Sequence, residues 1–280
     1  MNASDLSALR LLAKEDGALC TIVGIEGSYS RALGSHLAIA WNGRMAGSLA
    51  DGCLESELAT HAVALRNKAA KVTRFGRGSP LIDFRLPCGS GIDIHIDPTP
   101  DRTQIVRILS DLDARRPAMA EIDTLTVSYT PPLRIAALGS GPEVAAVARL
   151  AAAMDIDCET HLPADAGRRG LTLGKPPGDV AIDAWTAILL LFHDHEWEQA
   201  LLEWAIATPA FHIGAIGGWR TRQRRLAQLK ARGLSDPETD RIRAPVGLIP
   251  STRDSATLAL SILAQVVGEY GQLSGTTAPY

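Results

Sequence analysis

The sequence lacks the features that mark several classes of protein. Its four cysteines form no Cys-x-x-Cys pair, which argues against a zinc knuckle or a disulfide framework. No apolar run approaches the length that spans a bilayer, and the N-terminus has neither the basic head nor the apolar core of a signal peptide. A net charge of -3 gives no general attraction to nucleic acids or anionic membranes. We therefore expect a cytoplasmic protein with no nucleic-acid partner and no membrane span.

The sequence does contain enough apolar residues for two ordinary domains. Hydrophobic residues make up 46% of the 280 positions, and a chain of this length commonly forms two cores. Prolines at positions 117, 131 and 132 interrupt regular structure, because proline continues neither a helix nor a central strand. We place the boundary near Thr130, which gives a first domain of residues 1–130 and a second of residues 131–280.

The first domain is predicted to be mixed α+β. Asn42-Gly43 is a strong signal for a tight hairpin turn, because both central positions of that turn need positive φ. Residues 24–34 contain three glycines and are expected to form a loop that can wrap a ligand. The predicted helices cover residues 6–12, 54–65 and 103–112, and the predicted strands cover residues 19–23, 35–41, 44–49, 71–75, 81–86 and 92–96.

The second domain alternates strand and helix patterns, which predicts an α/β fold of the Rossmann type with a parallel sheet covered on both faces. The predicted strands cover residues 133–138, 156–160, 179–182, 186–192 and 210–216. An alanine-rich helix is expected to end near Met154, and further helices are predicted over residues 196–207, 221–232 and 255–267.

Cys53 is the first candidate for chemistry. It stands between Gly52 and the helix predicted over residues 54–65. A thiol at a helix entry meets unpaired backbone N–H groups and the positive end of the helix dipole, and both favour the thiolate. The alternative is a small apolar residue that packs the start of the helix. Cys88, beside Gly89, is a second candidate thiol, and its alternative is a half-buried cysteine in a turn.

Gly139 and Gly141 follow a strand and begin the fingerprint of a dinucleotide-binding turn. Two parts of the fingerprint are missing. Val144 occupies the third glycine position, which weakens close packing between helix and strand, and no acidic residue ends the second strand, where residues 160–163 stand. NAD(P) is therefore not expected, although the predicted strand order does not depend on these residues.

The segment His193-Asp194-His195-Glu196 follows an apolar strand, at the edge where ligands bind in open α/β sheets. These side chains are able to bind a metal or transfer protons. The alternative is that Asp194 caps a helix beside surface histidines.

The segment of residues 220–232 carries six basic residues after Gly217-Gly218-Trp219. We expect a solvated helix face. Arg220 is the exception, because a residue beside the glycine turn can reach a phosphate in the crevice.

Together these motifs resemble the XdhC/CoxI family, accessory factors for molybdenum hydroxylases, over nearly the whole chain. The sequence departs from the family pattern at Arg243, at residues 249–251 and at Gly218-Trp219. In the first domain the matching blocks are Glu26-Gly27-Ser28, Gly34, Asn42-Gly43-Arg44, Gly47-Ser48, Gly52-Cys53-Leu54-Glu55 and Cys88-Gly89. In the second domain they are Gly139-x-Gly141-Pro142, His193-Asp194, residues 211–217 and residues 244–248.

The resemblance implies a factor that binds the molybdopterin cofactor, in its bare or its cytidine dinucleotide form. Such a factor assists the sulfuration of the cofactor, with a cysteine desulfurase as sulfur donor, and inserts it into the apo-enzyme of a xanthine dehydrogenase-type hydroxylase. It also implies a homodimer. Thiolates are soft ligands suited to molybdenum, and glycine-rich backbone and arginine suit the pterin and its phosphate. The cofactor-binding residues on this reading are Gly27, Ser28, Gly52, Cys53, Glu55, Cys88, Gly89, Gly139, Gly141, His193, Asp194, Gly217 and Arg220, with Cys53 as the candidate molybdenum contact.

On this reading we expect a chaperone rather than a catalyst, and we assign no catalytic residue. The chain is too short for a xanthine dehydrogenase and lacks the cysteine clusters of its iron–sulfur centres. Three other functions stay open: an NAD(P)-dependent oxidoreductase with a degenerate Rossmann site, a metal-dependent enzyme that uses His193, His195 and Glu196, and a purely structural or interaction protein.

Overall fold

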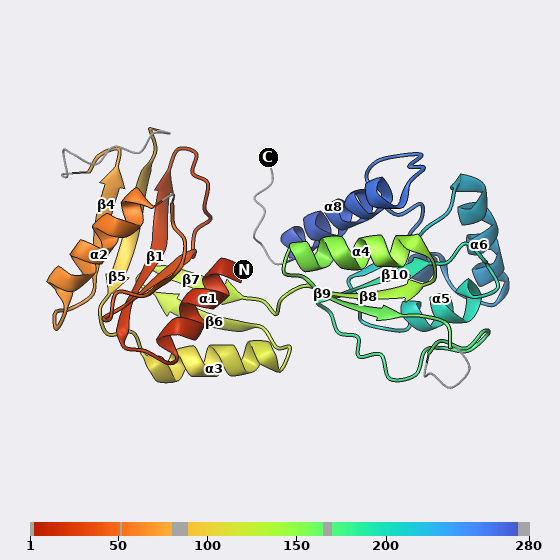
Figure 1. Ribbon diagram of the computed structural model, residues 1–280, viewed down its shortest axis with the longest axis horizontal. Helices are drawn as coiled ribbons and strands as arrows, with labels where there is room; N and C mark the ends of the chain where they lie inside the picture. The colour runs from red at the N-terminus through yellow and green to blue at the C-terminus, as the bar shows by residue number, and fades with distance from the viewer. Residues whose placement is uncertain (1–2, 51, 80–88, 165–169, 274–280) are drawn as a thin grey trace. The chain divides into compact units, whose positions relative to one another are not determined.

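A computed structural model describes residues 3–50, 52–79, 89–164 and 170–273. The chain divides between Pro131 and Pro132 into two compact units, which Figure 1 labels by element. In the part of the chain that the structure describes, no helix is both long and apolar enough to cross a membrane.

The first unit is built on a five-stranded antiparallel sheet with β1 at its centre, paired with β2 on one side and β5 on the other. The turn predicted at Asn42-Gly43 joins β2 to β3, and Gly43 has a φ of 88°. The strands, in spatial order, are β3 (Met45–Gly47), β2 (His36–Ala40), β1 (Gly17–Glu26), β5 (Gly91–Asp97) and β4 (Lys71–Gly76).

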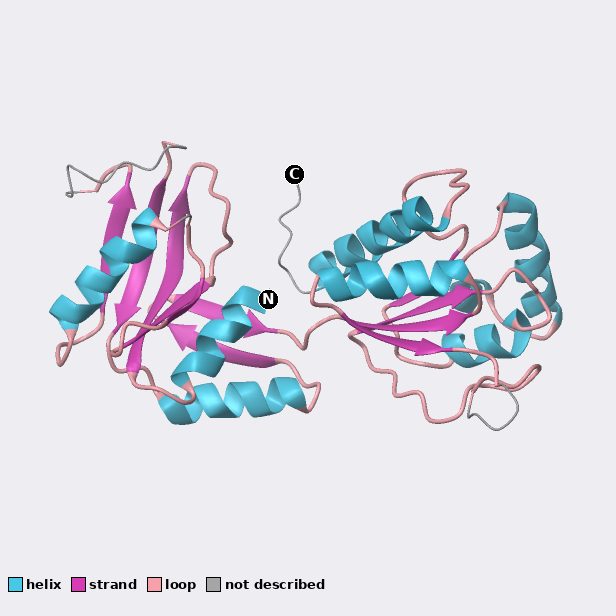
Figure 2. Cartoon of the chain, viewed as in Figure 1, coloured by secondary structure: helices cyan, strands magenta, loops and turns pink. Residues whose placement is uncertain are grey.

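Helices cover both faces of this sheet (Figure 2). The side chain of Leu19 packs with α1 (Ala3–Leu12) and α3 (Arg102–Asp113), whereas Cys20 packs with α2 (Cys53–Leu65). Leu19 and Cys20 belong to cores on opposite faces of the sheet, because successive side chains of a strand alternate between its faces. A two-stranded hairpin of β6 (Ala118–Ile122) and β7 (Leu125–Tyr129) completes the core on the side of α1 and α3.

The second unit contains the predicted parallel sheet, with strand order β12-β11-β10-β8-β9. One face packs against α4 and α8 and the other against α5 and α6, an arrangement that Figure 1 also shows. The strands are β8 (Arg134–Gly139), β9 (Asp157–His161), β10 (Thr186–Leu191), β11 (His212–Ala215) and β12 (Ile242–Arg243). The helices are α4 (Pro142–Ala153), α5 (Glu198–Ile206), α6 (Trp219–Ala231), the short α7 (Asp236–Thr239) and α8 (Ser255–Leu273).

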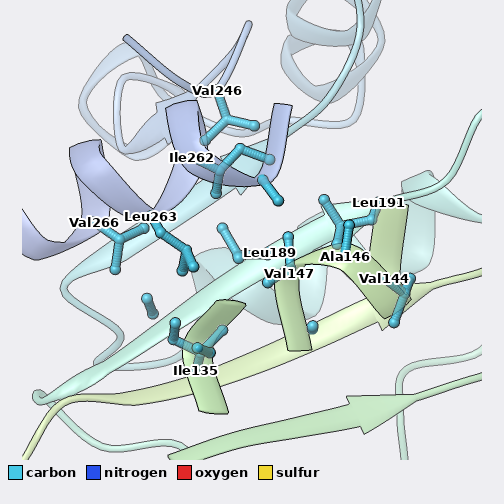
Figure 3. Close-up of a cluster of buried hydrophobic side chains, with 14 of the residues drawn as sticks. Ile135, Val144, Ala146, Val147, Leu189, Leu191, Val246, Ile262, Leu263 and Val266 are labelled. Carbon is cyan, nitrogen blue, oxygen red and sulfur yellow. The ribbon is translucent and has the colours of Figure 1, made fainter. Parts of the chain in front are cut away.

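Aliphatic side chains from α4 and α8 meet those of the sheet in the core shown in Figure 3. Val147, Leu189 and Ile262 are completely buried there. Val144, at the third glycine position of the fingerprint, is 3% exposed and belongs to the same core. Valine at this position is therefore part of the packing between the helix and the sheet.

One sequence prediction about local structure is wrong, and one element of the fold was missed. Residues 179–182 form a loop and no strand, and the apolar Val180 and Ile182 that suggested the strand anchor that loop on the core of α5 and α6. The hairpin of β6 and β7 was not predicted, because the prolines beside it mark its ends rather than an unstructured linker. The strand predicted over residues 81–86 lies outside the described residues.

Strand β1 also continues to Glu26, beyond the predicted start of the loop at Gly24. The pairing with β5 shifts register between Ile22 and Gly24. A Cβ on Gly24 would lie 2.5 Å from Oδ2 of Asp93, so glycine permits the close approach that lets the strand continue through the irregularity.

The core of the second unit gives a test with a matched control on one helix. Leu263 of α8 is 1% exposed and Leu260 is 54% exposed. We expect Leu263→Ala to lower the free energy of unfolding by about 2–5 kcal/mol, because it removes buried methylenes and leaves a cavity. Leu260→Ala should cost less than about 1 kcal/mol. Urea denaturation followed by tryptophan fluorescence measures the free energy of unfolding of the second unit, because every tryptophan except Trp41 lies in that unit. Equal losses would contradict the placement of α8.

Candidate functional site

Two glycine-rich loops of the first unit leave the same end of the sheet. Glu26 at the end of β1 pairs with Gly91 at the start of β5. A Cβ on Gly27 would lie 3.6 Å from Cβ of Ser90. The turn of Gly27-Ser28 and the described residues Gly89 and Ser90 are therefore neighbours.

A third loop, which leads from β3 into α2, is attached to the first by two side chains. The hydroxyl of Tyr29 donates to the carbonyl of Leu49 over 2.7 Å. Nη2 of Arg31 donates to Oγ of Ser48 over 3.2 Å. The loop after β1 and the loop before Cys53 are thus held together by hydrogen bonds from their own side chains.

The carboxylate of Glu55 fixes the shape of the third loop. Its Oε1 accepts from the backbone N–H groups of Leu49 at 3.0 Å and Ala50 at 2.7 Å, and its Oε2 accepts from Gly52 at 2.8 Å. The residue is only 8% exposed. Burial alone would raise its pKa, but the bonds from these backbone N–H groups outweigh it and hold the pKa below the ordinary value. Glu55 therefore positions the loop and leaves little of its carboxylate for a ligand.

The main chain at Gly52 and Cys53 lies at the head of this arrangement. Helix α2 begins at Cys53, as predicted, and Gly52 precedes it with a φ of 100°. Apart from the chain neighbours, no atom of the described residues lies within 4 Å of the position that a Cβ on Gly52 would occupy, and the same holds for Gly89. Both glycines are exposed, so their backbone is accessible to a bound group. Cys88 lies outside the described residues.

Two arginines near these loops, Arg74 and Arg31, differ in whether carboxylates of the described residues pair with them. Arg74 pairs with Glu26 and, at 2.8 Å, with Asp93, which fixes the start of the Gly27 turn. Arg31 is half-buried, and among the described residues no carboxylate pairs with it. Its guanidinium keeps donors for an anionic ligand beside the loop that leads to Cys53.

The other two cysteines are unsuited to thiolate chemistry. Burial raises the pKa of Cys20 to about 12. Burial, together with the charges of Asp157 and Glu159, raises the pKa of Cys158 to about 11. Both thiols stay protonated at neutral pH and act as small core or half-buried side chains.

The second unit brings a separate group of predicted residues to the carboxyl edge of its sheet. Gly139 ends β8 directly beside Leu191 of β10. The strand order reverses here, because β9 lies on one side of β8 and β10 lies on the other. Gly141 caps α4 with a φ of 90°. His193 follows β10, and its Nε2 lies 3.2 Å from Oε1 of Glu143.

Glu143 changes what this turn can bind. Its Oε2 is buried and accepts no hydrogen bond from the described residues. That atom lies 3.2 Å from the position of a Cβ on Gly141. A carboxylate therefore lies at the head of α4, where the phosphates of a dinucleotide bind in proteins with the complete fingerprint.

The remaining predicted residues of this edge do not converge on one point. Asp194 caps the local turn through the N–H of Glu196 at 2.9 Å. His195 pairs with Glu198 at 3.0 Å, whereas His193 pairs with Glu143. Across the described ranges, no three side chains of the metal-binding types gather as an ion site. The geometry therefore gives no support to a metal centre of His193, His195 and Glu196.

Gly217 and Arg220 lie at the end of β11. Gly217 has a φ of 123°, and Arg220 is exposed in the first turn of α6, which begins at Trp219, earlier than predicted. The prediction of a solvated face for this helix is wrong at Arg225, which is 4% exposed. Its guanidinium forms a buried ion pair with Glu198 of α5.

Several residues of these two regions were missed from the sequence: Tyr29, Arg31, Arg74, Glu143, Glu198 and Arg225. Arg31 carried a usable signal, because it lies in a glycine-rich loop. Glu198 and Arg225 are separated by 27 positions, and nothing in either local pattern marks them as partners.

Glu55 provides a direct test of the loop architecture. We expect Glu55→Gln to remove hydrogen-exchange protection from the amides of Ala50 and Gly52, because an amide oxygen is a weaker acceptor than a carboxylate. The destabilisation should be about 1–3 kcal/mol. Because the pKa of Glu55 is lowered from 4.5, the wild-type contribution is complete above that pH and lost as the pH falls below it.

The matched control is Glu57→Gln, on the same helix but paired with His61. It should leave the protection of Ala50 and Gly52 unchanged at every pH. Equal effects of the two substitutions would show that Glu55 does not hold the loop.

Comparison with known proteins agrees with this architecture. Residues 135–266 match the XdhC Rossmann domain, and residues 11–76 match the XdhC and CoxI family. The chain is 32% identical over 277 residues to the molybdenum cofactor insertion chaperone PaoD of Escherichia coli (strain K12), covering 91% of this chain and 84% of PaoD. A solved structure described as a xanthine dehydrogenase from Bacillus halodurans has the same fold, with a TM-score of 0.72 and 18% identity over 99% of this chain and 98% of that one. The chain belongs to the XdhC and CoxI family.

Proposed function

We propose that this protein is an insertion chaperone for the molybdenum cofactor and that the loops of its first unit hold the cofactor. The observation that carries the proposal is the convergence of the Gly27 turn, the Gly89 segment and the loop before Cys53. The description of PaoD as a molybdenum cofactor insertion chaperone, together with the 32% identity between the two chains, supports it.

The donor set of the loops fits such a ligand. Exposed glycine backbone at Gly52 and Gly89 suits close contact with a flat pterin, and Arg31 suits a phosphate. Cys53, at the first position of α2, supplies a soft ligand type to molybdenum. The bound cofactor supplies the oxo and sulfido chemistry of its metal, and the protein binds, orients and shields it.

The remaining parts of the proposal are supported by the resemblance to the family alone. The protein assists sulfuration of the cofactor with a cysteine desulfurase as sulfur donor, and it delivers the cofactor to a xanthine dehydrogenase-type apo-enzyme. The cofactor is either the bare molybdopterin form or its cytidine dinucleotide, and the protein acts as a homodimer in the cytoplasm.

The proposal predicts that Cys53→Ala lowers the molybdopterin content of protein isolated from cells that make the cofactor. Loss of one soft ligand should weaken binding by about tenfold or more, which corresponds to about 1.4 kcal/mol. Oxidation of the bound pterin and fluorescence detection measure its amount per mole of protein. Cys158→Ala, in β9 of the second unit, is the control and should keep the wild-type content. Equal content in wild type and Cys53→Ala would remove Cys53 from the site.

The alternative of an NAD(P)-dependent oxidoreductase is favoured by the Gly139-x-Gly141 turn and the strand order. The carboxylate of Glu143 opposes it, because a pyrophosphate at the head of α4 would face a negative charge whose one partner among the described residues is the exposed His193. We propose that NAD(P) is not a ligand of this protein.

Calorimetric titration with NAD and with NADP at millimolar concentration should show no saturable heat. Glu143→Gln keeps the shape of the side chain and removes its charge, so any residual affinity of the turn for dinucleotides should first become measurable in that variant. Saturable binding of either nucleotide to the wild-type protein would revive the oxidoreductase alternative.

A further inference from the structure

A cleft between α5 and α6 contains a buried arginine whose hydrogen bonds are incomplete. The cleft is open to solvent and small, with about 20 Å³ that a water-sized group can occupy. The residues that line it and matter here are His195, Glu198, Thr221, Arg224, Arg225 and Gln228. None of them was predicted from the sequence to bind an anion.

Arg225 uses only one edge of its guanidinium for protein contacts. Nε and Nη2 donate to the two carboxylate oxygens of Glu198 at 3.2 and 2.6 Å, and Nη2 also donates to the carbonyl of Ile216 at 2.9 Å. Nη1 is buried and has no acceptor among the residues that the structure describes. Because the guanidinium is planar, Nη1 lies on the side away from the edge that Glu198 occupies.

An unpaired buried donor on a charged group is unfavourable, and native proteins rarely leave one without a partner. The partner that best satisfies a guanidinium is an anionic oxygen, which forms shorter and stronger hydrogen bonds than a neutral acceptor. The cleft has room for roughly one water-sized group, which is the size of one oxygen atom of an anion.

The rest of the cleft supplies donors around this point. The charge of Glu198 is already balanced by Arg225, and the exposed Arg224 also lines the cleft, with no carboxylate paired to it among the residues that the structure describes. The hydroxyl of Thr221 and the amide of Gln228 add neutral donors. Donors on several sides suit a tetrahedral anion with several oxygens better than they suit a planar carboxylate.

We propose that this cleft binds a phosphate group, with one oxygen on Nη1 of Arg225 and the others on Arg224, Thr221 and Gln228. The phosphate is either free inorganic phosphate or the phosphate of a larger phosphorylated molecule. The site lies in the second unit and does not depend on the function proposed for the loops of the first unit.

The test is calorimetric titration of the full-length protein with inorganic phosphate, ribose 5-phosphate and acetate at constant ionic strength. The variant is Arg224→Gln, because Arg224 is exposed and its loss spares the buried pair of Arg225 and Glu198. The matched control is Arg222→Gln, which removes the same charge from the same helix but stacks on Trp219 and does not line the cleft. Thr221→Val is a second, nearly isosteric variant.

We expect a phosphate to bind wild type and Arg222→Gln alike, to bind Arg224→Gln about tenfold more weakly and to bind Thr221→Val more weakly than wild type. Tighter binding of inorganic phosphate indicates the free ion as ligand, and tighter binding of ribose 5-phosphate indicates a larger phosphorylated molecule. The proposal is overturned if neither phosphate binds, if acetate binds as tightly as phosphate, or if Arg222→Gln and Arg224→Gln weaken binding equally. None of these results depends on molybdopterin loading, so a failure here is distinct from a failure of the proposed function.

Discussion

The hydrogen bonds between the carboxylate of Glu55 and three backbone amides are the interaction on which the candidate site depends. They close the loop from Leu49 to Gly52 onto the first turn of α2 and so determine where Cys53 begins the helix. Exposed glycine backbone has no intrinsic preference for one conformation. A buried carboxylate that accepts from these amides supplies the order that the sequence of the loop does not.

The same principle operates at the carboxyl edge of the second sheet. Glu198 holds Arg225 against the carbonyl of Ile216 at the end of β11, and Glu143 is paired with His193 at the head of α4. Each glycine turn is thus accompanied by a carboxylate from a neighbouring helix. In the first unit the oxygens of Glu55 accept from backbone N–H groups of their own loop, whereas at Gly141 the Oε2 of Glu143 accepts no hydrogen bond from the described residues and competes with anions. This difference is the physical reason for assigning the cofactor to the first unit.

Short sequence patterns predicted the elements whose conformation depends mainly on residues close together in the chain. Asn42-Gly43 specified its hairpin, Cys53 marked the start of α2, and the alternation of strands and helices after Leu133 specified the parallel sheet. A strand was wrongly predicted over residues 179–182, because two apolar side chains that anchor a loop give the same sequence pattern as a short strand. The hairpin of β6 and β7 was missed because Pro117 and Pro131 border it.

The contacts that shape the sites could not be predicted in this way. The bonds from Tyr29 to Leu49 and from Arg31 to Ser48 join loops about twenty positions apart. The burial of Arg225 follows from a partner on another helix, and a helix with so many basic residues gave no reason to expect a buried one. The sequence located the glycines of the candidate site, but only the fold shows which side chains hold their loops in place.

Hydrogen–deuterium exchange with and without the isolated molybdenum cofactor tests whether the loops of the first unit hold it. Added cofactor should slow exchange in the loop after β1, in the residues before α2 and at the start of β5, while exchange at the edge of Gly139, Gly141 and His193 should change little. Slowed exchange confined to that second edge, with the loops of the first unit unaffected, would show that these loops do not hold the cofactor.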